Sequence, residues 1–378
     1  MKVLQLAATM LSLERFALPL MERLRENGFE VEAMAQFDGT EGRLQDAGFP
    51  THDWRAGHTF NPLQILGARR QLAAFLQSAD YDILHSHCSF GGIIGNPVAQ
   101  RRIPHVIYTQ HGFFVHEGLS PLRRTAWLGL EKIGLRPANH VICVSRAEQE
   151  LARQLGVGPP EKFVHVPGAG IDIAKFQLDE SERQERRRRV REELALSEDE
   201  LVLLTVSRLT WDKGYREMIE AVRQLRENEH EFVFLAAGSG KDETAVRQAI
   251  EDAGVGDRFR LLGWRDDVED LYCAADVFVF ASYREGLPIS PIEAMAGGLP
   301  VVASDIPGCC EEIEDEESGL LFATGDADGL ARRLAQVIAD APLRQSLGER
   351  ARQRAQMFDI GLVLDRQLEL YGELVDHT

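Results

Sequence analysis

One segment in the second half of the chain carries two cations that could hold a diphosphate. Residues 207–214 read Ser-Arg-Leu-Thr-Trp-Asp-Lys-Gly and directly follow the apolar run Leu201–Val206. Arg208 can bind a diphosphate as a two-pronged fork, and Lys213 can bind it as a point charge. In a parallel sheet, ligands bind at the carboxyl ends of strands, where this segment would lie. The alternative is an ordinary surface loop with two charges.

A second segment carries two carboxylates that suit the hydroxyls of a sugar and the diol of a ribose. Glu285 precedes an expected helix and Glu293 lies within it, after the apolar run Val277–Phe280. Gly286 lets the backbone approach a ligand closely, and Pro288 suits the first turn of a helix. The unpaired amides of that turn would form an anion site. For Glu293 the alternative is an exposed helix glutamate, although its neighbours Ile292 and Ala294 are apolar.

A histidine in the first half occupies the comparable place after a strand. His111 follows the expected strand His105–Thr109 and is itself followed by Gly112. A lone histidine is more often structural than catalytic, but a position at a strand's carboxyl end favours function. We therefore expect His111 to face a ligand cleft.

Two short motifs could suggest a metal, but we expect neither to bind one. His85-Ser86-His87 has no carboxylate or third ligand beside it. Asp326-Ala327-Asp328 opens an expected helix, where an aspartate is favoured as the N-cap. The sequence therefore predicts a protein that needs no metal and no cofactor.

The elements that must position these residues alternate between short apolar strands and helical stretches. This alternation is typical of parallel α/β sheets, and 378 residues exceed what one core usually serves. We predict two doubly wound Rossmann-like domains, residues 1–168 and 169–359, with a final helix at 360–378 that could pack on either domain. One long helix is expected at Leu11–Asn27, and the arginine run Arg186–Arg189 is expected on a solvated helix with i,i+4 ion pairs.

Composition narrows the class further. The net charge of −18 argues against a nucleic-acid partner. The five cysteines fit no zinc spacing, and a reduced, cytoplasmic setting is the simplest interpretation. We see no signal peptide and no apolar window long enough to span a bilayer, so we expect a soluble or peripheral protein.

Taken together, these motifs resemble those of the family-4 retaining glycosyltransferases, which have the two-domain GT-B architecture with a central cleft. The segment with Arg208 and Lys213 is similar to that family's phosphate-binding segment, and Glu285 with Glu293 is similar to its paired-glutamate motif. The resemblance covers essentially the whole chain and implies that the final helix, residues 360–378, packs back on the first domain. One departure is Ala7-Ala8-Thr9-Met10-Leu11, where many members have a Gly-Gly loop.

The resemblance implies a role for each candidate residue. Arg208 and Lys213 would bind the donor diphosphate, Glu293 the ribose and Glu285 the transferred sugar, while His111 would contact the donor sugar. The remaining donor-side residues by this resemblance are Gly286, Leu287, Pro288 and Ile289 for sugar or phosphate, and Trp264 and Arg265 for the base. The donor would be a nucleoside-diphosphate sugar, with uridine diphosphate (UDP) preferred and guanosine diphosphate next.

The acceptor side is suggested by a basic, amphipathic stretch. Residues 101–136 hold six Arg or Lys against two Glu, and a helix from about residue 119 to 135 interleaves them with apolar side chains. Such a helix is typical of membrane-surface binding, or else buries its apolar face in the domain. The stretch His111–His116 resembles family members that extend polyprenyl-diphosphate-linked sugars in surface-polysaccharide or glycoprotein assembly, which implies peripheral contact with the cytoplasmic face of the membrane. Candidate acceptor or membrane residues are Phe113, His116, Arg123, Arg124 and Trp127.

Other functions remain as alternatives. A nucleotide-sugar 2-epimerase shares the architecture but would need no acceptor, and a transferase could also use a soluble acceptor. A sugar-nucleotide-binding protein that has lost activity is disfavoured, because all five candidate residues for chemistry are present. They are Arg208, Lys213, Glu285, Glu293 and His111. An NAD-dependent dehydrogenase is disfavoured because no Gly-x-Gly-x-x-Gly follows the first strand.

Overall fold

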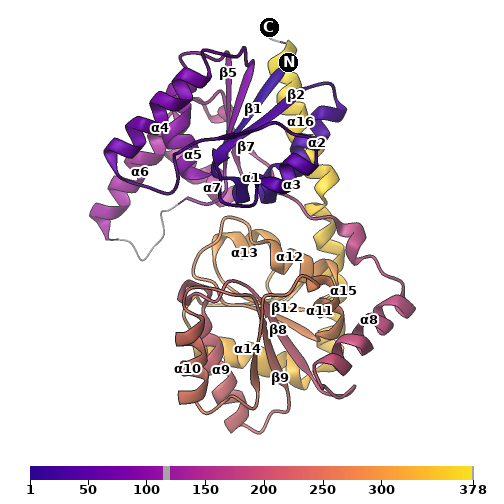
Figure 1. Cartoon of the computed structure of the whole chain (residues 1–378). Helices are drawn as coiled ribbons and strands as arrows, with labels where there is room; N and C mark the ends of the chain where they lie inside the picture. The colour runs from indigo at the N-terminus through magenta and orange to yellow at the C-terminus, as the bar shows by residue number, and fades with distance from the viewer. Residues whose placement is uncertain (114–119, 377–378) are drawn as a thin grey trace. The chain divides into compact units, whose positions relative to one another are not determined.

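The computed structural model describes residues 1–113 and 120–376, and for residues 375 and 376 only the backbone (Figure 1). The chain forms two compact units, one of Met1–Gly170 with Gly361–Thr378 and one of Ile171–Ile360. The sequence placed these divisions after residues 168 and 359.

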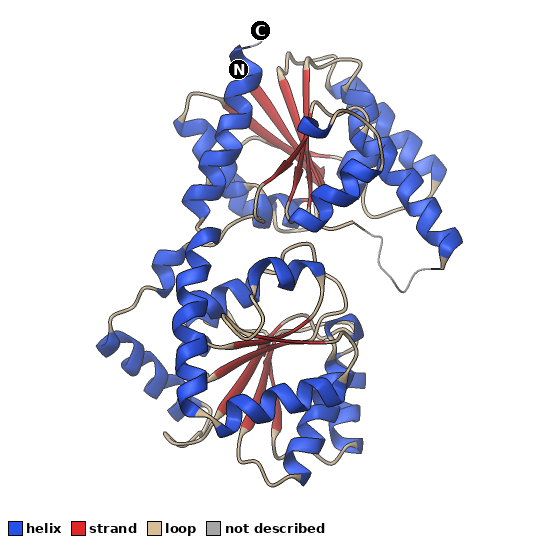
Figure 2. Ribbon diagram, turned by 180° about the vertical axis from the view of Figure 1, so that it is seen from behind, coloured by secondary structure: helices blue, strands red, loops and turns tan. Residues whose placement is uncertain are grey.

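Unit 1 is built on a sheet of seven described strands, all parallel, in the order β3-β2-β1-β4-β5-β6-β7. Helices flank both faces of the sheet (Figure 2). The strands are β1 Lys2–Thr9, β2 Glu30–Gln36, β3 Thr51–Asp53, β4 Ile83–His87, β5 His105–Gln110, β6 His140–Cys143 and β7 Phe163–His165. The helices are α1 Met10–Phe16, α2 Leu18–Glu26, α3 Glu41–Asp46, α4 Pro62–Phe75, α5 Cys88–Ala99, α6 Pro121–Leu135, α7 Arg146–Gln154, η1 Pro160–Lys162 and α16 Ile360–Asp376.

Unit 2 repeats this architecture with six described parallel strands in the order β10-β9-β8-β11-β12-β13. The strands are β8 Val202–Val206, β9 Val233–Ala237, β10 Phe259–Gly263, β11 Val277–Phe280, β12 Val301–Ser304 and β13 Leu320–Phe322. The helices are η2 Ile173–Phe176, α8 Glu180–Glu193, η3 Trp211–Lys213, α9 Tyr215–Glu227, α10 Glu243–Asp252, α11 Val268–Ala274, α12 Ile289–Ala296, α13 Pro307–Glu312, α14 Ala327–Ala339, α15 Ala341–Ala355 and η4 Gln356–Phe358.

Both sheets reverse their strand order at one point, and this point positions the candidate residues. The reversal lies between β1 and β4 in unit 1 and between β8 and β11 in unit 2. In open α/β sheets the ligand crevice lies outside the carboxyl ends of the strands at such a switch point. The prediction of two doubly wound Rossmann-like sheets is confirmed.

The expected single helix at Leu11–Asn27 is wrong, because the structure has two helices there. Helix α1 ends at Phe16 and α2 begins at Leu18. Pro19 lies in the first turn of α2, where its missing N–H costs nothing, whereas inside one long helix it would remove a hydrogen bond.

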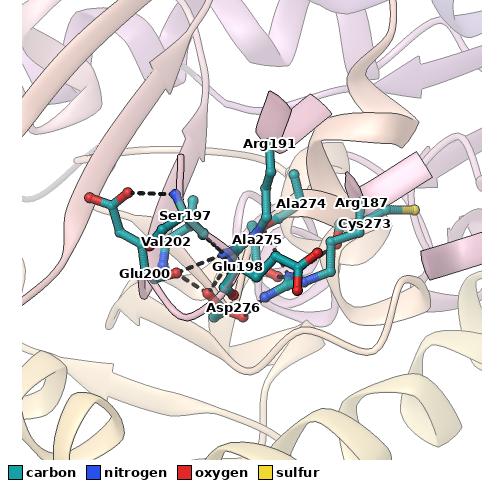
Figure 3. A network of polar contacts seen from close by, with 10 residues as sticks. All are labelled: Arg187, Arg191, Ser197, Glu198, Glu200, Val202, Cys273, Ala274, Ala275 and Asp276. Atoms are coloured by element: carbon teal, nitrogen blue, oxygen red, sulfur yellow. Dashed lines mark hydrogen bonds and ion pairs between the residues drawn. The ribbon is translucent and has the colours of Figure 1, made fainter. Parts of the chain in front are cut away.

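The arginine run is only partly solvated. Arg186 makes the expected i,i+4 pair with Glu182, but Arg187 and the nearby Arg191 reach from α8 to Asp276 at 2.7 and 2.8 Å. Figure 3 shows both guanidinium groups converging on Asp276 and on the carbonyls around it. Arg191 is 2% exposed and also donates to the carbonyls of Ala274, Ser197, Glu198 and Glu200. These arginines therefore attach α8 to the start of β11.

Candidate donor site at the switch point of unit 2

Lys213 and Glu285 come together at the carboxyl ends of β8 and β11. The Lys213 ammonium donates to Oε1 of Glu285, and the side chains are 10% and 21% exposed. Ser282 also donates to this oxygen, at 2.9 Å. Two residues separated by 72 positions therefore form one partly buried ion pair at the strand-order reversal.

The backbone fixes Lys213 in this place. Gly214, which follows it, has φ +76, and a Cβ there would lie 2.1 Å from the carbonyl oxygen of Ala281. The Tyr283 amide donates to the Asp212 carbonyl at 2.9 Å. Only glycine permits both this conformation and this close approach, so η3 lies directly against the end of β11.

Arg208 lies beside the pair but remains accessible. Its guanidinium is 3.8 Å from Oδ2 of Asp212, and its side chain is 67% exposed. Burial opposes the charged form of Asp212, yet its pKa lies below the usual value, and the positive charges of Lys213 and Arg208 contribute to this. Both cations therefore act on the same small region, as a diphosphate site requires.

The loop from Glu285 to Ile289 is closely packed. Gly286 and Pro288 are buried, Leu287 and Ile289 are partly buried, and a Cβ on Gly308 would lie 2.8 Å from the Gly286 carbonyl oxygen. The sequence suggested that Pro288 lies in the first turn of a helix. In the structure it is instead the N-cap residue of α12. Since proline has no N–H, and Pro291 also lies in the first turn, the amides available at this helix start are those of Ile289 and Ser290.

Glu293 is held on α12 by a tyrosine that the sequence did not single out. The Tyr272 hydroxyl donates to Oε2 of Glu293 at 2.8 Å. Burial raises the pKa of Glu293 to about 7, although this hydrogen bond favours the charged form. In its ionised form, a carboxyl group whose pKa is close to 7 can accept hydrogen bonds from two vicinal hydroxyls.

The two residues expected at the nucleotide base differ in their availability. Trp264 is 61% exposed and donates from Nε1 to Asp266 at 2.8 Å. Arg265 instead binds Glu193 at 2.5 Å and Asp267 at 2.6 Å, with 18% of its side chain exposed. The indole face is therefore accessible, whereas the guanidinium already has two carboxylate partners.

In unit 1, His111 lies just after β5 and is anchored from two sides. Its ring stacks on Phe16 with centroids 4.5 Å apart, and its Nε2 lies 3.3 Å from Nδ1 of His87. Burial lowers the pKa of His111 to about 4, so the ring is neutral at pH 7. Gly112 has φ +125, a conformation open to glycine, which turns the chain away from the strand.

The residues expected to face the acceptor or a membrane are divided by the structure. Phe113 is wrong for this role, because it is 4% exposed in the core of unit 1 and its amide donates to Glu148. His116 lies outside the described residues. Arg123 and Arg124 are exposed on α6. Trp127 is partly buried against Phe60, with the ring centroids 5.3 Å apart.

Helix α6 is covered on one face in its second half and exposed in its first half. Its second half is buried on one face, where Glu131 and Leu135 are 0% exposed and a Cβ on Gly134 would meet the backbone of Gly92 at 3.0 Å, whereas Ile133 is 42% exposed. Its first half is exposed and includes Leu122, which is 82% accessible. The amphipathic pattern therefore comes from a helix that is only half covered.

The Asp326 capping prediction is confirmed, because its side chain accepts from the Gly329 amide at 2.9 Å. Among the described residues, no three His, Cys, Asp or Glu side chains lie close enough together to hold a metal ion. The described part of the chain also has no helix long and apolar enough to cross a membrane.

Comparison with known proteins identifies the architecture. Residues 186–354 match the family described as Glycosyl transferases group 1, and residues 13–169 match the Glycosyl transferase 4-like domain. The Campylobacter jejuni N,N'-diacetylbacillosaminyl-diphospho-undecaprenol alpha-1,3-N-acetylgalactosaminyltransferase is 28% identical, over 97% of each chain. The Escherichia coli UDP-Gal:alpha-D-GlcNAc-diphosphoundecaprenol alpha-1,3-galactosyltransferase is also 28% identical, over 80% of this chain and 78% of that protein. Anabaena HepE, solved in complex with UDP, superposes with a TM-score of 0.80 at 22% identity, over 99% of this chain and 100% of its own.

Proposed function

Since the chain belongs to the family-4 glycosyltransferases of GT-B fold, we propose that it transfers a sugar from a UDP-sugar to a lipid-linked sugar with retention of configuration. The observation that carries the proposal is the ion pair of Lys213 and Glu285 at the switch point of unit 2. It combines a cation for the diphosphate with a carboxylate for the sugar.

The cations supply the electrostatic part of catalysis. As the bond from the sugar to the diphosphate breaks, negative charge grows on the leaving phosphate, and preorganised cations lower the barrier to this step. Lys213 is held in place by Glu285, and Arg208 is exposed beside it. Both would bind the diphosphate, and the departing phosphate would take the proton of the attacking acceptor hydroxyl on the same face.

The carboxylates hold the donor. Glu285 keeps one oxygen on Lys213 and Ser282, which suits a hydrogen-bond acceptor for the sugar better than a covalent nucleophile. Glu293 would accept the ribose hydroxyls, and the exposed indole of Trp264 would stack on the base. The two cations would make a metal unnecessary.

The lipid-linked acceptor rests on relatives and on one surface. Both relatives described above are named for undecaprenol-diphosphate-linked substrates. In unit 1, large apolar side chains at the start of α4 and of α6 are exposed, with Arg123 and Arg124 beside Leu122. They are Phe60, Leu63, Leu66 and Leu122. The ring of Phe60 contacts that of Trp127 on α6, so the two helix starts are neighbours, and we call the four side chains the apolar patch. Apolar groups beside basic ones suit the surface of an anionic bilayer.

A transfer assay tests the proposal. The full chain is incubated in EDTA with a polyprenyl-diphosphate-linked sugar and, in turn, UDP-glucose, UDP-galactose and their N-acetyl-amino counterparts. We expect one donor to give product whose new linkage keeps the donor's anomeric configuration by NMR. Release of free sugar without acceptor would instead indicate an epimerase or hydrolase, and dependence on a metal would contradict the role given to the cations.

A further inference from the structure

A continuous chain of buried hydrogen bonds runs from His111 across one face of the sheet in unit 1. Register pairs Gln5 of β1 with His85 of β4, and His87 of β4 with Thr109 of β5. Because side chains alternate along a strand and match across parallel neighbours, these four share one face. They are between 0% and 3% exposed, and Tyr371 of α16, 0% exposed, joins them there.

Each link of this chain is short enough to be a hydrogen bond. Nε2 of His87 lies 2.7 Å from Oε1 of Gln5, whose Nε2 donates to the Tyr371 hydroxyl at 3.0 Å. The same hydroxyl lies 2.7 Å from Nδ1 of His85, whose Nε2 lies 2.6 Å from the Thr109 hydroxyl. With the 3.3 Å contact of His87 to His111, the chain has five links.

The amide of Gln5 gives this chain one direction. Its oxygen can only accept, so His87 must carry its proton on Nε2, which leaves Nδ1 as an acceptor. His111 must then donate to that acceptor from its own Nε2. On the other side, the amide nitrogen of Gln5 donates to Tyr371, whose hydroxyl is left to donate to His85. A chain running the opposite way requires the Gln5 amide to turn over.

We propose that Gln5, His87 and Tyr371 are positioning residues that hold His111 in its Nε2–H tautomer, so that Nδ1 accepts a hydrogen bond from a hydroxyl of the donor sugar. This inference rests on the proposed function, together with the contact between His111 and the donor sugar that the family resemblance implies. It also gives a role to His85 and His87 of β4, a pair that could suggest a metal site. His85 contacts Tyr371 of α16, and His87 contacts Gln5 of β1.

The surroundings keep the proton count of the chain fixed. Burial lowers the pKa of His85 to about 3 and of His111 to about 4, and that of His87 lies well below its usual value. All three rings are thus neutral at pH 7. Each neutral ring has one donor and one acceptor, so the orientation at Gln5 is passed to His111. Stacking on Phe16 fixes the plane of the His111 ring.

The tautomer can be read directly by NMR of the full chain labelled with ¹⁵N-histidine, with His111→Ala used for assignment. We expect Nε2 of His111 protonated and Nδ1 unprotonated in the wild type. Tyr371→Phe removes the hydroxyl that anchors the Gln5 amide, so the opposite tautomer should become populated. Gln5→Met should have the same effect and serves if the first variant does not fold.

Tyr81→Phe is the matched control, because it also removes a buried tyrosine hydroxyl of unit 1. That hydroxyl donates to Glu32, which is not part of the hydrogen-bond chain between His111 and Thr109. Its His111 tautomer should match the wild type. A wild-type His111 protonated on Nδ1, or a tautomer unchanged in both Tyr371→Phe and Gln5→Met, would overturn the positioning role whatever the turnover.

Binding separates positioning from general damage. In Tyr371→Phe, affinity for the UDP-sugar that gives turnover should fall roughly two- to tenfold, the worth of one hydrogen bond, while affinity for UDP stays unchanged. Equal losses for both ligands would contradict the inference. A wild type that transfers no sugar from any donor would instead refute the proposed function, and the tautomer measurement would still decide the direction of the chain.

Discussion

Glu293 is a carboxylate held where burial opposes its charge. Its pKa of about 7 exceeds the ordinary value of 4.5, mainly because of burial. The folded chain therefore binds more protons than the unfolded chain between these values, and the free energy of unfolding decreases as pH rises through 7. A residue kept at such a cost to stability fits a role in binding.

We predict that Glu293→Gln is more stable than the wild type at pH 8 and gains much less at pH 5. The gain at pH 8 has an upper bound of about 3 kcal/mol, from 1.36 kcal/mol for each pKa unit. Melting temperatures at the two pH values measure it. Exposed Glu251→Gln is the control. UDP affinity should fall in Glu293→Gln, and unchanged affinity would contradict its ribose role.

At the residue scale, the sequence indicated Lys213, Glu285 and His111 because each follows a buried strand, and strand ends are visible in a pattern. Their partners were not visible. Ser282 is a residue type common in loops, so nothing in the sequence marks it as the partner of Glu285. Tyr371 lies 366 residues from Gln5, with which it forms a hydrogen bond. Contacts between distant segments depend on the completed fold, so no local spacing predicts them.

Helix α5 shows where pattern fails at the scale of elements. It was not predicted, because Gly91, Gly92, Gly95 and Pro97 are poor helix formers. The fold uses them for close packing: a Cβ on Gly92 would lie 2.7 Å from Tyr108, and one on Gly95 would lie 2.3 Å from Leu6. Tertiary contact overrides propensity here. The inner strands were predictable because they form buried, largely apolar runs, whereas the short edge strands β3 and β13 were not predicted.

Helix α8 provides a test at this scale. Arg191→Ala should lower the free energy of unfolding of unit 2 by about 3 kcal/mol or more, because it leaves buried carbonyls and Asp276 with fewer partners. Urea unfolding of the full chain measures the change. Arg188→Ala, which removes a 64% exposed arginine of the same helix, should change it by less than about 1 kcal/mol. Similar losses in both variants would contradict this account.

For the whole molecule, net charge and exposed apolar surface predict which part of the protein would bind a membrane. The chain has a net charge of −18, which opposes binding to anionic lipid, so any attraction must come from a local surface. The apolar patch of unit 1 with Arg123 and Arg124 is such a surface.

We expect the full chain to co-sediment with vesicles containing anionic lipid, and Leu63→Ser with Leu122→Ser to lower the bound fraction severalfold. These side chains are 79% and 82% exposed, so their loss should leave the fold intact. Leu362→Ser, at a 59% exposed leucine of α16, is the control and should bind as the wild type does. Equal binding by all three proteins would contradict the role of the apolar patch, and failure of the wild type to co-sediment would argue for a soluble acceptor.

Our proposal places the donor diphosphate at Lys213 and Glu285. Calorimetric titration of the full chain in EDTA with UDP, GDP and ADP measures whether a nucleotide binds there. We predict that UDP binds best and that Lys213→Ala weakens it about ten- to a hundredfold, the worth of a charge-assisted hydrogen bond. Exposed Arg247→Ala on α10 should bind UDP as the wild type does. UDP affinity unchanged in Lys213→Ala, or no binding of any nucleotide by the wild type, would contradict the claim.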